Sequence, residues 1–362
     1  MSILSLVVSC LCFFVLPVYA YDIATMTVEE KVGQLLMVHF LGHEVNDDAK
    51  LLVQKAHVGG IIYFRTANGL TSPEQVQNIS TELQKIADIP LLIAIDQEGG
   101  RISHLTEGFM VFASNWDVGQ NHDAKHAQDI AYTSSMQLQS LGINMNLAPV
   151  VDVNTNPLNP VIGDRSFSAD PKQVALFGKA ALQGYREGGT IATLKHFPGH
   201  GDTGVDSHYG LPIIDKTVSE LELCELYPFA QLANEAEVIM SAHILVPALD
   251  PVHCATFSKP ILEGVLREKL GFTGVIISDS LLMDGALLQA GSLEDAAINA
   301  CNAGCDLLII AGAFSKETLG SADSMYKVYL ALVEAVRDGR ITEERLNTSV
   351  ERILQLKQKH GL

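Results

Sequence analysis

The sequence is short of positive charge. Its 362 residues include 24 lysines and arginines against 42 aspartates and glutamates, which gives a formal net charge of −18 at pH 7 with neutral histidine. Binding to nucleic acid or to an anionic membrane surface requires a basic face, so this balance argues against both kinds of partner. The charge deficit does not by itself identify a substrate.

Long apolar runs are also scarce, with one exception at the start of the chain. Residues 1–20 carry no charged side chain, and the apolar run Ile3–Leu16 ends at Pro17. This run is too short for a comfortable transmembrane helix, and Val18–Ala20 offers the small residues that a signal peptidase reads. We therefore expect 1–20 to be an export signal and 21–362 to be periplasmic or secreted. An uncleaved anchor is the alternative, since no Lys or Arg precedes the run.

Cysteines and linker-like segments are few. Two of the six cysteines lie within residues 1–20, which leaves four in the mature chain: Cys224, Cys254, Cys301 and Cys305. Disulfides are permitted in an exported protein, but a chain with a core of this size does not depend on them. We therefore expect all four cysteines to be small core residues. No long segment rich in Ser, Pro or Gly divides the chain, which favours a single domain.

Apolar, strand-like segments alternate with segments of helical spacing. The expected strands are 34–40, 60–64, 91–95, 144–151, 191–194, 238–242, 274–278 and 306–310. The expected helices are 47–56, 73–87, 124–141, 171–187, 218–234, 258–270, 293–302, 321–337 and 342–360. Nearly continuous apolar strands are typical of a parallel sheet buried on both faces. The α/β alternation predicts a single (β/α)8 barrel of the TIM type, with a doubly wound sheet as the alternative.

Polar residues at the strand ends help to choose between these folds. Asp96, Asp152, Lys195-His196, His243 and Asp279 each stand at or just after the end of an apolar run. In a barrel they would converge on the C-terminal rim, where such enzymes place their chemistry. In an open sheet only those at the switch point would meet. Their spread over five strands favours the barrel.

One stretch, KHFPGHGDTGVDSH, concentrates titratable groups and glycine. Its His196 and His200 have the i, i+4 spacing of a zinc helix, but a proline and a glycine between them prevent that helix, and no Glu follows the first histidine. A metal held with Asp202 or Asp206 is the weaker alternative. We therefore expect no metal site, and we expect His200 to pack within the loop.

The end of the same stretch, Asp206-Ser207-His208, reads as an acid/base device. A carboxylate two residues away on a loop can accept from one imidazole nitrogen, which fixes the tautomer and raises the basicity of the other nitrogen. Such a pair is a competent general acid/base near neutral pH. Ser207 as the nucleophile of a triad is disfavoured, because no G-x-S-x-G turn surrounds it.

Three other motifs supply candidate groups. Asp279, in IISDS at a strand end, suits a nucleophile, an acceptor that orients a ligand, or a helix cap. Asp96, in IDQEGGR, suits an acceptor for sugar hydroxyls, with Arg101 as a scaffold partner of Glu98. Arg165, in GDRSF, suits either a substrate clamp or a partner of the preceding aspartate.

Taken together, these motifs resemble the signature of family 3 glycoside hydrolases and, more narrowly, of their β-N-acetylglucosaminidase branch. KHFPGHG followed four residues later by DSH carries the resemblance most specifically. Other matching segments follow in the family's order: DQEGGR at 96–101, NLAPVVDV at 146–153, GDRSF at 163–167 and SDSLLMDGA at 278–286. The resemblance implies that 21–362 is the family's (β/α)8 catalytic domain, of N-terminal type.

The resemblance also implies a retaining mechanism without a metal or organic cofactor. Asp279 corresponds to the nucleophile, and His208, oriented by Asp206, corresponds to the general acid/base on a mobile loop. Four further positions match those that hold the sugar in the −1 subsite: Asp96, Arg165, Lys195 and His196. The sequence departs from the family's pattern at Ser280, where an acidic residue often stands, and at His104, where an arginine is common.

We therefore expect an exported exo-β-N-acetylhexosaminidase that removes terminal, non-reducing β-linked N-acetylglucosamine. Its substrate would be a small glycan, namely a muropeptide in peptidoglycan turnover, a chitin fragment or a host glycoconjugate. We expect no nucleic acid and no stable membrane partner. The alternatives are an N-acetylglucosaminide phosphorylase, a β-glucosidase and a non-catalytic sugar-binding barrel.

Overall fold

The strands close into a barrel. The computed structural model describes residues 21–312 and 320–362, so the expected export signal lies outside the described residues. Within them, one sheet of eight parallel strands has the spatial order β10-β1-β2-β3-β6-β7-β8-β9. Hydrogen bonds from Ser278 N to Leu307 O (2.9 Å) and from Leu307 N to Ile276 O (3.1 Å) join β9 to β10. The predicted (β/α)8 barrel is confirmed, because a doubly wound sheet would keep two open edges.

The strands lie where the apolar runs predicted them. They are β1 (Leu36–Val38), β2 (Gly60–Tyr63), β3 (Leu92–Ile95), β6 (Met145–Asn146), β7 (Ile191–Phe197), β8 (Val238–Ser241), β9 (Val275–Ile277) and β10 (Leu308–Ile310). β7 extends three residues beyond its expected end. β6 is short because Pro149 has no N–H for the ladder, although Val151 N still donates to Lys195 O over 2.8 Å.

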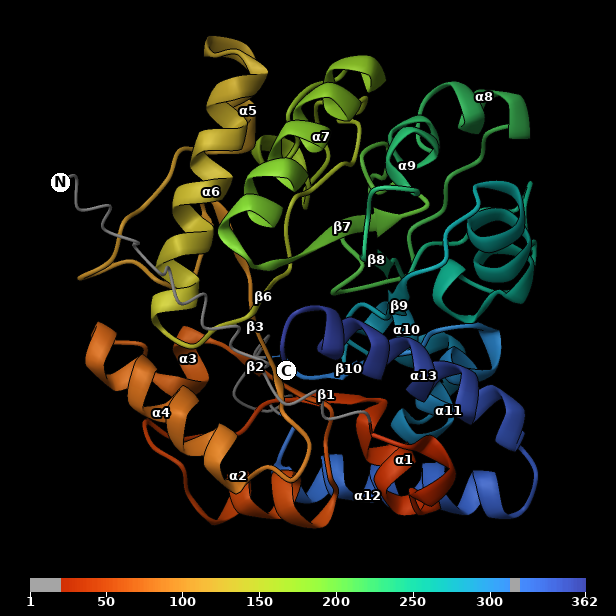
Figure 1. Ribbon diagram of the computed structural model, residues 1–362. Helices are drawn as coiled ribbons and strands as arrows, with labels where there is room; N and C mark the ends of the chain where they lie inside the picture. The colour runs from red at the N-terminus through yellow and green to blue at the C-terminus, as the bar shows by residue number, and fades with distance from the viewer. Residues whose placement is uncertain (1–20, 313–319) are drawn as a thin grey trace, which may run out of the picture.

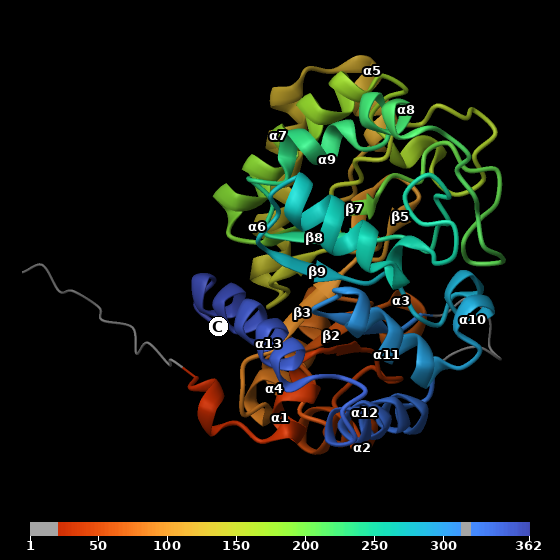
Figure 2. The same ribbon diagram turned by 90° about the vertical axis from the view of Figure 1, so that its right-hand side faces the viewer.

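Helices surround the barrel on all sides (Figures 1 and 2). The α-helices are α1 (Val28–Gln34), α2 (Asp47–Lys50), α3 (Arg65–Asn68), α4 (Pro73–Ile86), α5 (Asn115–Asn121), α6 (Ala124–Ser140), α7 (Pro171–Gly188), α8 (Val218–Leu223), α9 (Tyr227–Leu232), α10 (Asp284–Ala290), α11 (Leu293–Ala303), α12 (Ala322–Arg337) and α13 (Glu343–Lys359). Two π-helical segments, η2 (Leu51–Lys55) and η5 (Pro260–Lys269), cover further parts of the predicted helices. No helix among the described residues is long and apolar enough to cross a membrane.

One predicted helix, 218–234, is divided into α8 and α9. Pro228 lacks the N–H that would bond the carbonyl of Cys224, and α8 ends there, with Cys224 outside helical geometry. Elsewhere the local signals suffice. α4 begins where the Ser72 hydroxyl accepts from Gln75 N and Pro73 takes the first helical position.

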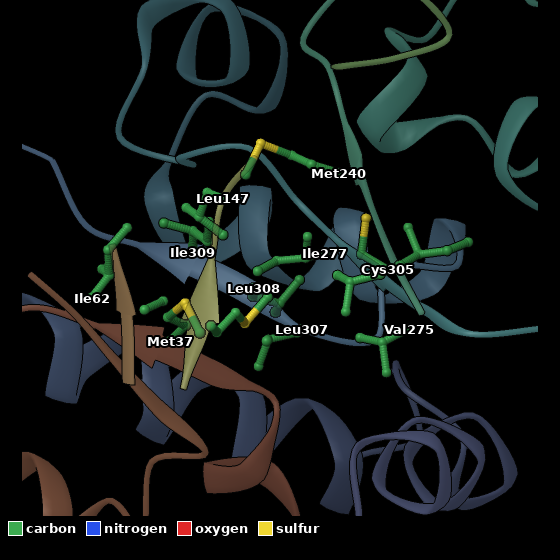
Figure 3. Close-up of a cluster of buried hydrophobic side chains, with 14 of the residues drawn as sticks. Met37, Ile62, Leu147, Met240, Val275, Ile277, Cys305, Leu307, Leu308 and Ile309 are labelled. Carbon is green, nitrogen blue, oxygen red and sulfur yellow. The ribbon is translucent and has the colours of Figure 1, made fainter. Parts of the chain in front are cut away.

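The barrel interior is filled by apolar side chains. Figure 3 shows side chains from different strands meeting there, among them Met37, Ile62, Met240, Ile277 and Ile309. All five are at most 3% exposed. The interior is therefore a packed core, and a pocket can open only at its end. Cys254, Cys301 and Cys305 are buried, Cys224 is partly buried, and all four are free thiols, as expected for small core residues.

An antiparallel hairpin follows β3 at the C-terminal end of the barrel. It consists of β4 (Gln97–Gly99) and β5 (Ile102–Ser103). Gly99 and Gly100 turn the chain with φ of +99° and +54°, and a Cβ on Gly99 would overlap the carbonyl oxygen of Ala113. The hairpin places the residues on its two sides at the mouth of the barrel. In Figure 2, β5 and α10 lie on the right of the molecule, and α13 lies toward the left.

Candidate active site

A pocket of about 290 Å³ opens at the C-terminal ends of the strands. Six of the seven predicted site residues line it: Asp96, Arg165, Lys195, His196, His208 and Asp279. The seventh, Asp206, binds His208 directly. The structure thus brings together groups from the ends of β3, β7 and β9 and from two loops. An open sheet would not gather them in this way.

A buried ion network forms one wall of the pocket. Arg165 donates from Nε and Nη2 to the two carboxylate oxygens of Glu98, each over 2.9 Å. Lys195 Nζ lies 2.6 Å from both Glu98 Oε1 and Asp96 Oδ1. Lys195 is 2% exposed, so its charge has to be balanced from within the protein.

The electrostatics keep this network charged. Burial alone would raise the pKa of Glu98, but Arg165 and Lys195 more than offset it and lower the pKa to about 2. Burial would lower the pKa of Lys195, but Asp96 and Glu98 raise it above its usual value. The side chain of Asp96 is 20% exposed and lies at the pocket, which suits an acceptor for ligand hydroxyl groups.

The partners that the sequence suggested for the two arginines were wrong. Arg101 does not pair with Glu98 but with Asp164, from Nε to Oδ1 over 2.7 Å. Arg165 does not pair with Asp164 but with Glu98. The reason is the β4–β5 hairpin, which turns Glu98 into the buried wall and leaves Arg101 half exposed beyond the turn.

The side chains of Arg165 and Asp152 hold His196 in one tautomer. Arg165 Nη2 lies 3.1 Å from His196 Nε2, and a guanidinium can only donate, so Nε2 accepts. Nδ1 therefore carries the hydrogen and donates to Asp152 Oδ2 over 2.6 Å. A register shift between Leu194 and Phe197 interrupts the β7–β8 ladder, and such irregularities re-aim side chains. Both Lys195 and His196 reach the pocket as a result.

Asp279 stands alone at the end of β9 and does not cap a helix. Its Oδ1 accepts from Ser280 N over 2.7 Å, whereas α10 begins only at Asp284 and has no side-chain cap. Burial would raise the pKa of Asp279, but the nearby His196, His243 and His208 lower it below its ordinary value. The carboxylate is therefore ionised at neutral pH and faces the pocket as a potential nucleophile.

His208 and Asp206 form the pair that the spacing predicted. His208 Nδ1 lies 2.6 Å from Asp206 Oδ1, which also accepts from His208 N over 3.0 Å. Burial opposes ionisation of Asp206, but these bonds from His208 lower its pKa below the usual value. The charged carboxylate can thus orient the imidazole ring.

The other polar groups of the KHFPGHGDTGVDSH stretch are used within the protein. His200 Nδ1 lies 2.7 Å from Thr203 Oγ1 and its Nε2 lies 3.0 Å from Ser207 Oγ, so His200 packs in the loop as predicted. Asp202 pairs with Lys216 over 3.0 Å. Within 21–312 and 320–362, no group of three or more His, Cys, Asp or Glu side chains is placed to hold a metal ion.

Two residues, one in the pocket wall and one beside Asp279, have roles that the sequence did not predict. Glu98 neutralises both Arg165 and Lys195, and the sequence clue was its position two residues after Asp96 with a Gly-Gly turn behind it. His243 lies beside Asp279: its Nε2 donates to Ser280 O over 2.9 Å. The strand-end pattern marked His243 as polar but did not reveal this partner.

Comparisons with known proteins show which family the chain is similar to. The profile of the glycosyl hydrolase family 3 N-terminal domain matches residues 27–356. Beta-hexosaminidase A of Pseudoalteromonas piscicida is 37% identical over 332 residues, which cover 85% of this chain and 54% of that protein. The beta-hexosaminidase of Idiomarina loihiensis is 37% identical over 279 residues, covering 76% of this chain and 83% of that protein.

Solved structures show the same likeness. The family 3 beta-N-acetylglucosaminidase from Paenibacillus sp. str. FPU-7 superimposes with a TM-score of 0.88 at 42% identity, over 92% of this chain and 63% of that one. The chain thus spans about half the length of the Pseudoalteromonas protein and most of the Idiomarina protein. On the extent of the profile match and the identity to these relatives, the chain belongs to family 3 of the glycoside hydrolases.

Proposed function

We propose that the chain is a retaining exo-β-N-acetylhexosaminidase that hydrolyses terminal β-linked N-acetylglucosamine. The observation that carries this proposal is the meeting of Asp279 and the His208–Asp206 pair in one pocket. A retaining glycosidase needs a nucleophilic carboxylate and a proton donor for the leaving oxygen. The names of the similar proteins support the choice of sugar.

In the first step, Asp279 attacks the anomeric carbon while the bond to the leaving oxygen breaks. Protonated His208 donates its proton from Nε2 to that oxygen, because Asp206 engages Nδ1. The products of this step are a glycosyl ester on Asp279, the released alcohol and neutral His208. Throughout the step, the Asp206 carboxylate orients the imidazole ring.

In the second step, neutral His208 removes a proton from water, and the water oxygen attacks the anomeric carbon. The ester bond breaks, the Asp279 carboxylate is restored and the sugar leaves with its original β configuration. One histidine thus serves as acid and then as base, which requires that the same loop position suits both steps.

The ion network supplies the sugar-binding wall. Asp96 would accept hydrogen bonds from sugar hydroxyls, and Lys195 and Arg165 would donate to polar atoms of the −1 sugar. His196 lines the same wall and would contact the sugar beside them. Apolar side chains, including Ile62, Met240 and Ile309, line other parts of the pocket. A pocket that is closed below by a packed barrel core suits the terminal unit of a glycan better than an internal unit.

The test is a panel of aryl β-glycosides that differ at the 2-position, assayed with and without phosphate. We expect hydrolysis of the 2-acetamido substrate, with the β-anomer appearing first by NMR and with no sugar 1-phosphate. Sugar 1-phosphate would instead identify a phosphorylase. A preference for the 2-hydroxy substrate would identify a β-glucosidase. No turnover of any substrate would indicate a sugar-binding barrel.

We also propose that the protein is exported by residues 1–20, which would place its glycan substrate outside the cytoplasm. The apolar run and the small residues that follow it support this assignment. Mass spectrometry of the protein recovered from expressing cells should show a mature chain beginning at Tyr21. A full-length chain retained with the membrane would instead indicate an uncleaved anchor.

A further inference from the structure

Residues 204–211, which carry the His208–Asp206 pair, stand out from the barrel and are called the acid loop below. Val205 and Tyr209 are 48% and 73% exposed, whereas Ser207 between them is 2% exposed. The loop therefore has one buried residue, and this residue lies between the two partners of the acid/base pair.

Ser207 is fastened from two opposite sides. Its hydroxyl lies 3.0 Å from Nε2 of His200, and its carbonyl oxygen accepts from Gly285 N over 3.0 Å. The Gly285 amide belongs to the first turn of α10, where N–H groups have no partner within the helix. These two hydrogen bonds join Ser207, and with it the acid loop, to the rest of the barrel.

The polarity of the first bond follows from the partners of His200. Thr203 Oγ1 donates its one hydrogen to the carbonyl oxygen of His200 over 3.0 Å, so it accepts from His200 Nδ1. His200 Nε2 then has no hydrogen and accepts from the Ser207 hydroxyl. Burial lowers the pKa of His200 to about 4, which agrees with a neutral ring.

His200 is itself fixed to the sugar-binding wall. Its backbone N–H donates to Asp152 Oδ1 over 2.7 Å, and the other oxygen of Asp152 accepts from His196 Nδ1. A continuous set of hydrogen bonds therefore runs from His196 through Asp152 and His200 to Ser207. The buried carboxylate of Asp152 therefore supports both the His196 ring, which lines the pocket, and, through His200, the acid loop.

Close packing at α10 supports the second bond. A Cβ on Gly285 would lie 2.9 Å from Ser207 O and 3.0 Å from Gly210 O. Any larger residue at this position would push the acid loop away from the helix. The missing side chain of Gly285 thus lets the acid loop approach α10, and the Gly285 N–H then stabilises this contact by its bond to Ser207 O.

We infer that Ser207 is a positioning residue for the reaction, and that its bonds to His200 and Gly285 hold His208 in line with the leaving oxygen. This inference rests on the proposed function, because it explains how His208 is oriented and takes the role of His208 as the acid from that proposal. Ser207 has no part in bond breaking. Its loss should therefore resemble a partial loss of His208 without loss of Asp279.

The test is Ser207→Ala, assayed with a sugar leaving group and with an activated aryl leaving group. We expect kcat/KM to fall about 10-fold to 100-fold for the sugar substrate, as part of the 10²–10⁴ typical of a general acid. The fall for the activated aryl substrate should stay below about 3-fold, because that leaving group needs little protonation. Ser140→Ala, at an exposed serine ending α6, is the matched control and should change neither value.

Gly285→Ala tests the second anchor with the Ser207 hydroxyl intact, and it should show the same contrast between substrates. Added azide should speed turnover of the aryl substrate by both variants, because an anionic nucleophile needs no general base. Faster amide hydrogen exchange at His208 and Tyr209 should accompany the loss, with little change in the unfolding midpoint.

Equal losses on both substrates, or unchanged rates in both variants, would overturn the inference. If a variant does not fold, the exchange of the acid loop in Ser207→Thr, which keeps the hydroxyl, decides the matter: slow exchange is expected, and fast exchange would contradict the role of the hydroxyl bond. Failure of the unmodified protein to hydrolyse any aryl glycoside would instead contradict the proposed function.

Discussion

The two halves of the KHFPGHGDTGVDSH stretch are held in different ways. Lys195 and His196 are at most 5% exposed, and the side chain of each contacts two charged side chains. The acid loop at 204–211 extends into solvent and is anchored through Ser207. The groups proposed to hold the sugar are therefore buried among charged partners, whereas the group proposed to move a proton lies on a segment whose residues, Ser207 apart, are partly or fully exposed to solvent.

This difference suits the two tasks. A binding wall loses least free energy when it is formed before the ligand arrives, so its charges are fixed in advance. The released alcohol has to leave and water has to enter beside the acid/base, which favours a loop at the solvent-exposed mouth of the pocket. Asp279, at the end of β9, belongs with the fixed charges. We call Asp96, Glu98, Lys195, His196 and Asp279 together the fixed rim.

The largest effect should come from removing the proposed nucleophile of the fixed rim. We expect Asp279→Ala to lower kcat/KM at least on the order of 10⁴-fold for every leaving group, because no glycosyl ester can form. Steady-state assays with aryl and sugar substrates measure this loss. Asp284→Ala removes an exposed aspartate at the start of α10 and should leave activity unchanged. Full activity of Asp279→Ala would show that another group is the nucleophile.

The next largest effect should come from the acid loop, and it should depend on the substrate. His208→Ala is expected to lose on the order of 10²–10⁴-fold with a sugar leaving group. The loss in glycosyl-enzyme formation should be much smaller with an activated aryl group, as pre-steady-state assays can show. His122→Ala, at an exposed histidine, provides the control. Losses independent of the leaving group would remove the distinction between the rim and the loop.

Breaking the ion network should reduce stability rather than select among substrates. Glu98→Gln leaves Arg165 and Lys195 buried without a full counter-charge, which typically costs about 3–5 kcal/mol in the free energy of unfolding. Denaturant titration measures this cost. Glu82→Gln, in an exposed ion pair with Lys85, should change stability by less than about 1 kcal/mol. A small cost for Glu98→Gln would show that the network does not stabilise the fixed rim.

The same carboxylate should make stability depend on pH. The pKa of Glu98 is about 2 in the folded protein against an ordinary 4.5, so the folded state holds the proton more weakly than the unfolded chain. This contribution to stability is complete above pH 4.5 and is lost as the pH falls toward 2. Glu98→Gln should therefore show a shallower decline in stability over that range. An unchanged slope would contradict the assignment.

The smallest effects come from two glycines, one on each side of the boundary between the halves. A Cβ on Gly201 would overlap Val153 O, so Gly201→Ala should cost about 1–3 kcal/mol of stability. Gly204 has open space around it and no positive φ, so Gly204→Ala should be neutral or stabilising by about 0.4–1 kcal/mol. Thermal unfolding compares the two variants directly. Equal costs would show that both halves are equally packed.

The sequence predicted the barrel because the relevant signals are local. The spacing of apolar residues and the polar residues at strand ends are each visible within a few positions, and they placed the strands and most helices. The division of 218–234 into two helices was missed because the helical spacing of apolar residues continues past Pro228. A proline can stand in the first turn of a new helix or at a break within one helix, and the local pattern does not distinguish the two. The pairing of Asp206 with His208 was predictable for the same reason, since only Ser207 stands between them.

Pairings across the fold were not predictable from spacing. Glu98 and Arg165 lie 67 positions apart, and their contact depends on how a hairpin turns at Gly99. The nearest opposite charges in sequence were therefore the wrong partners for Arg101 and Arg165. The anchoring of Ser207 by Gly285 was missed as well, because nothing in either local pattern points to the other segment.

The most direct test of the central claim is to trap the sugar on the enzyme. In His208→Ala, an activated aryl β-N-acetylglucosaminide should form the glycosyl ester readily, whereas its hydrolysis lacks a base and becomes slow. Mass spectrometry of the digested protein should then show one added N-acetylglucosamine on the peptide that contains Asp279. Absence of an adduct during slow turnover, or an adduct on a different residue, would contradict the account.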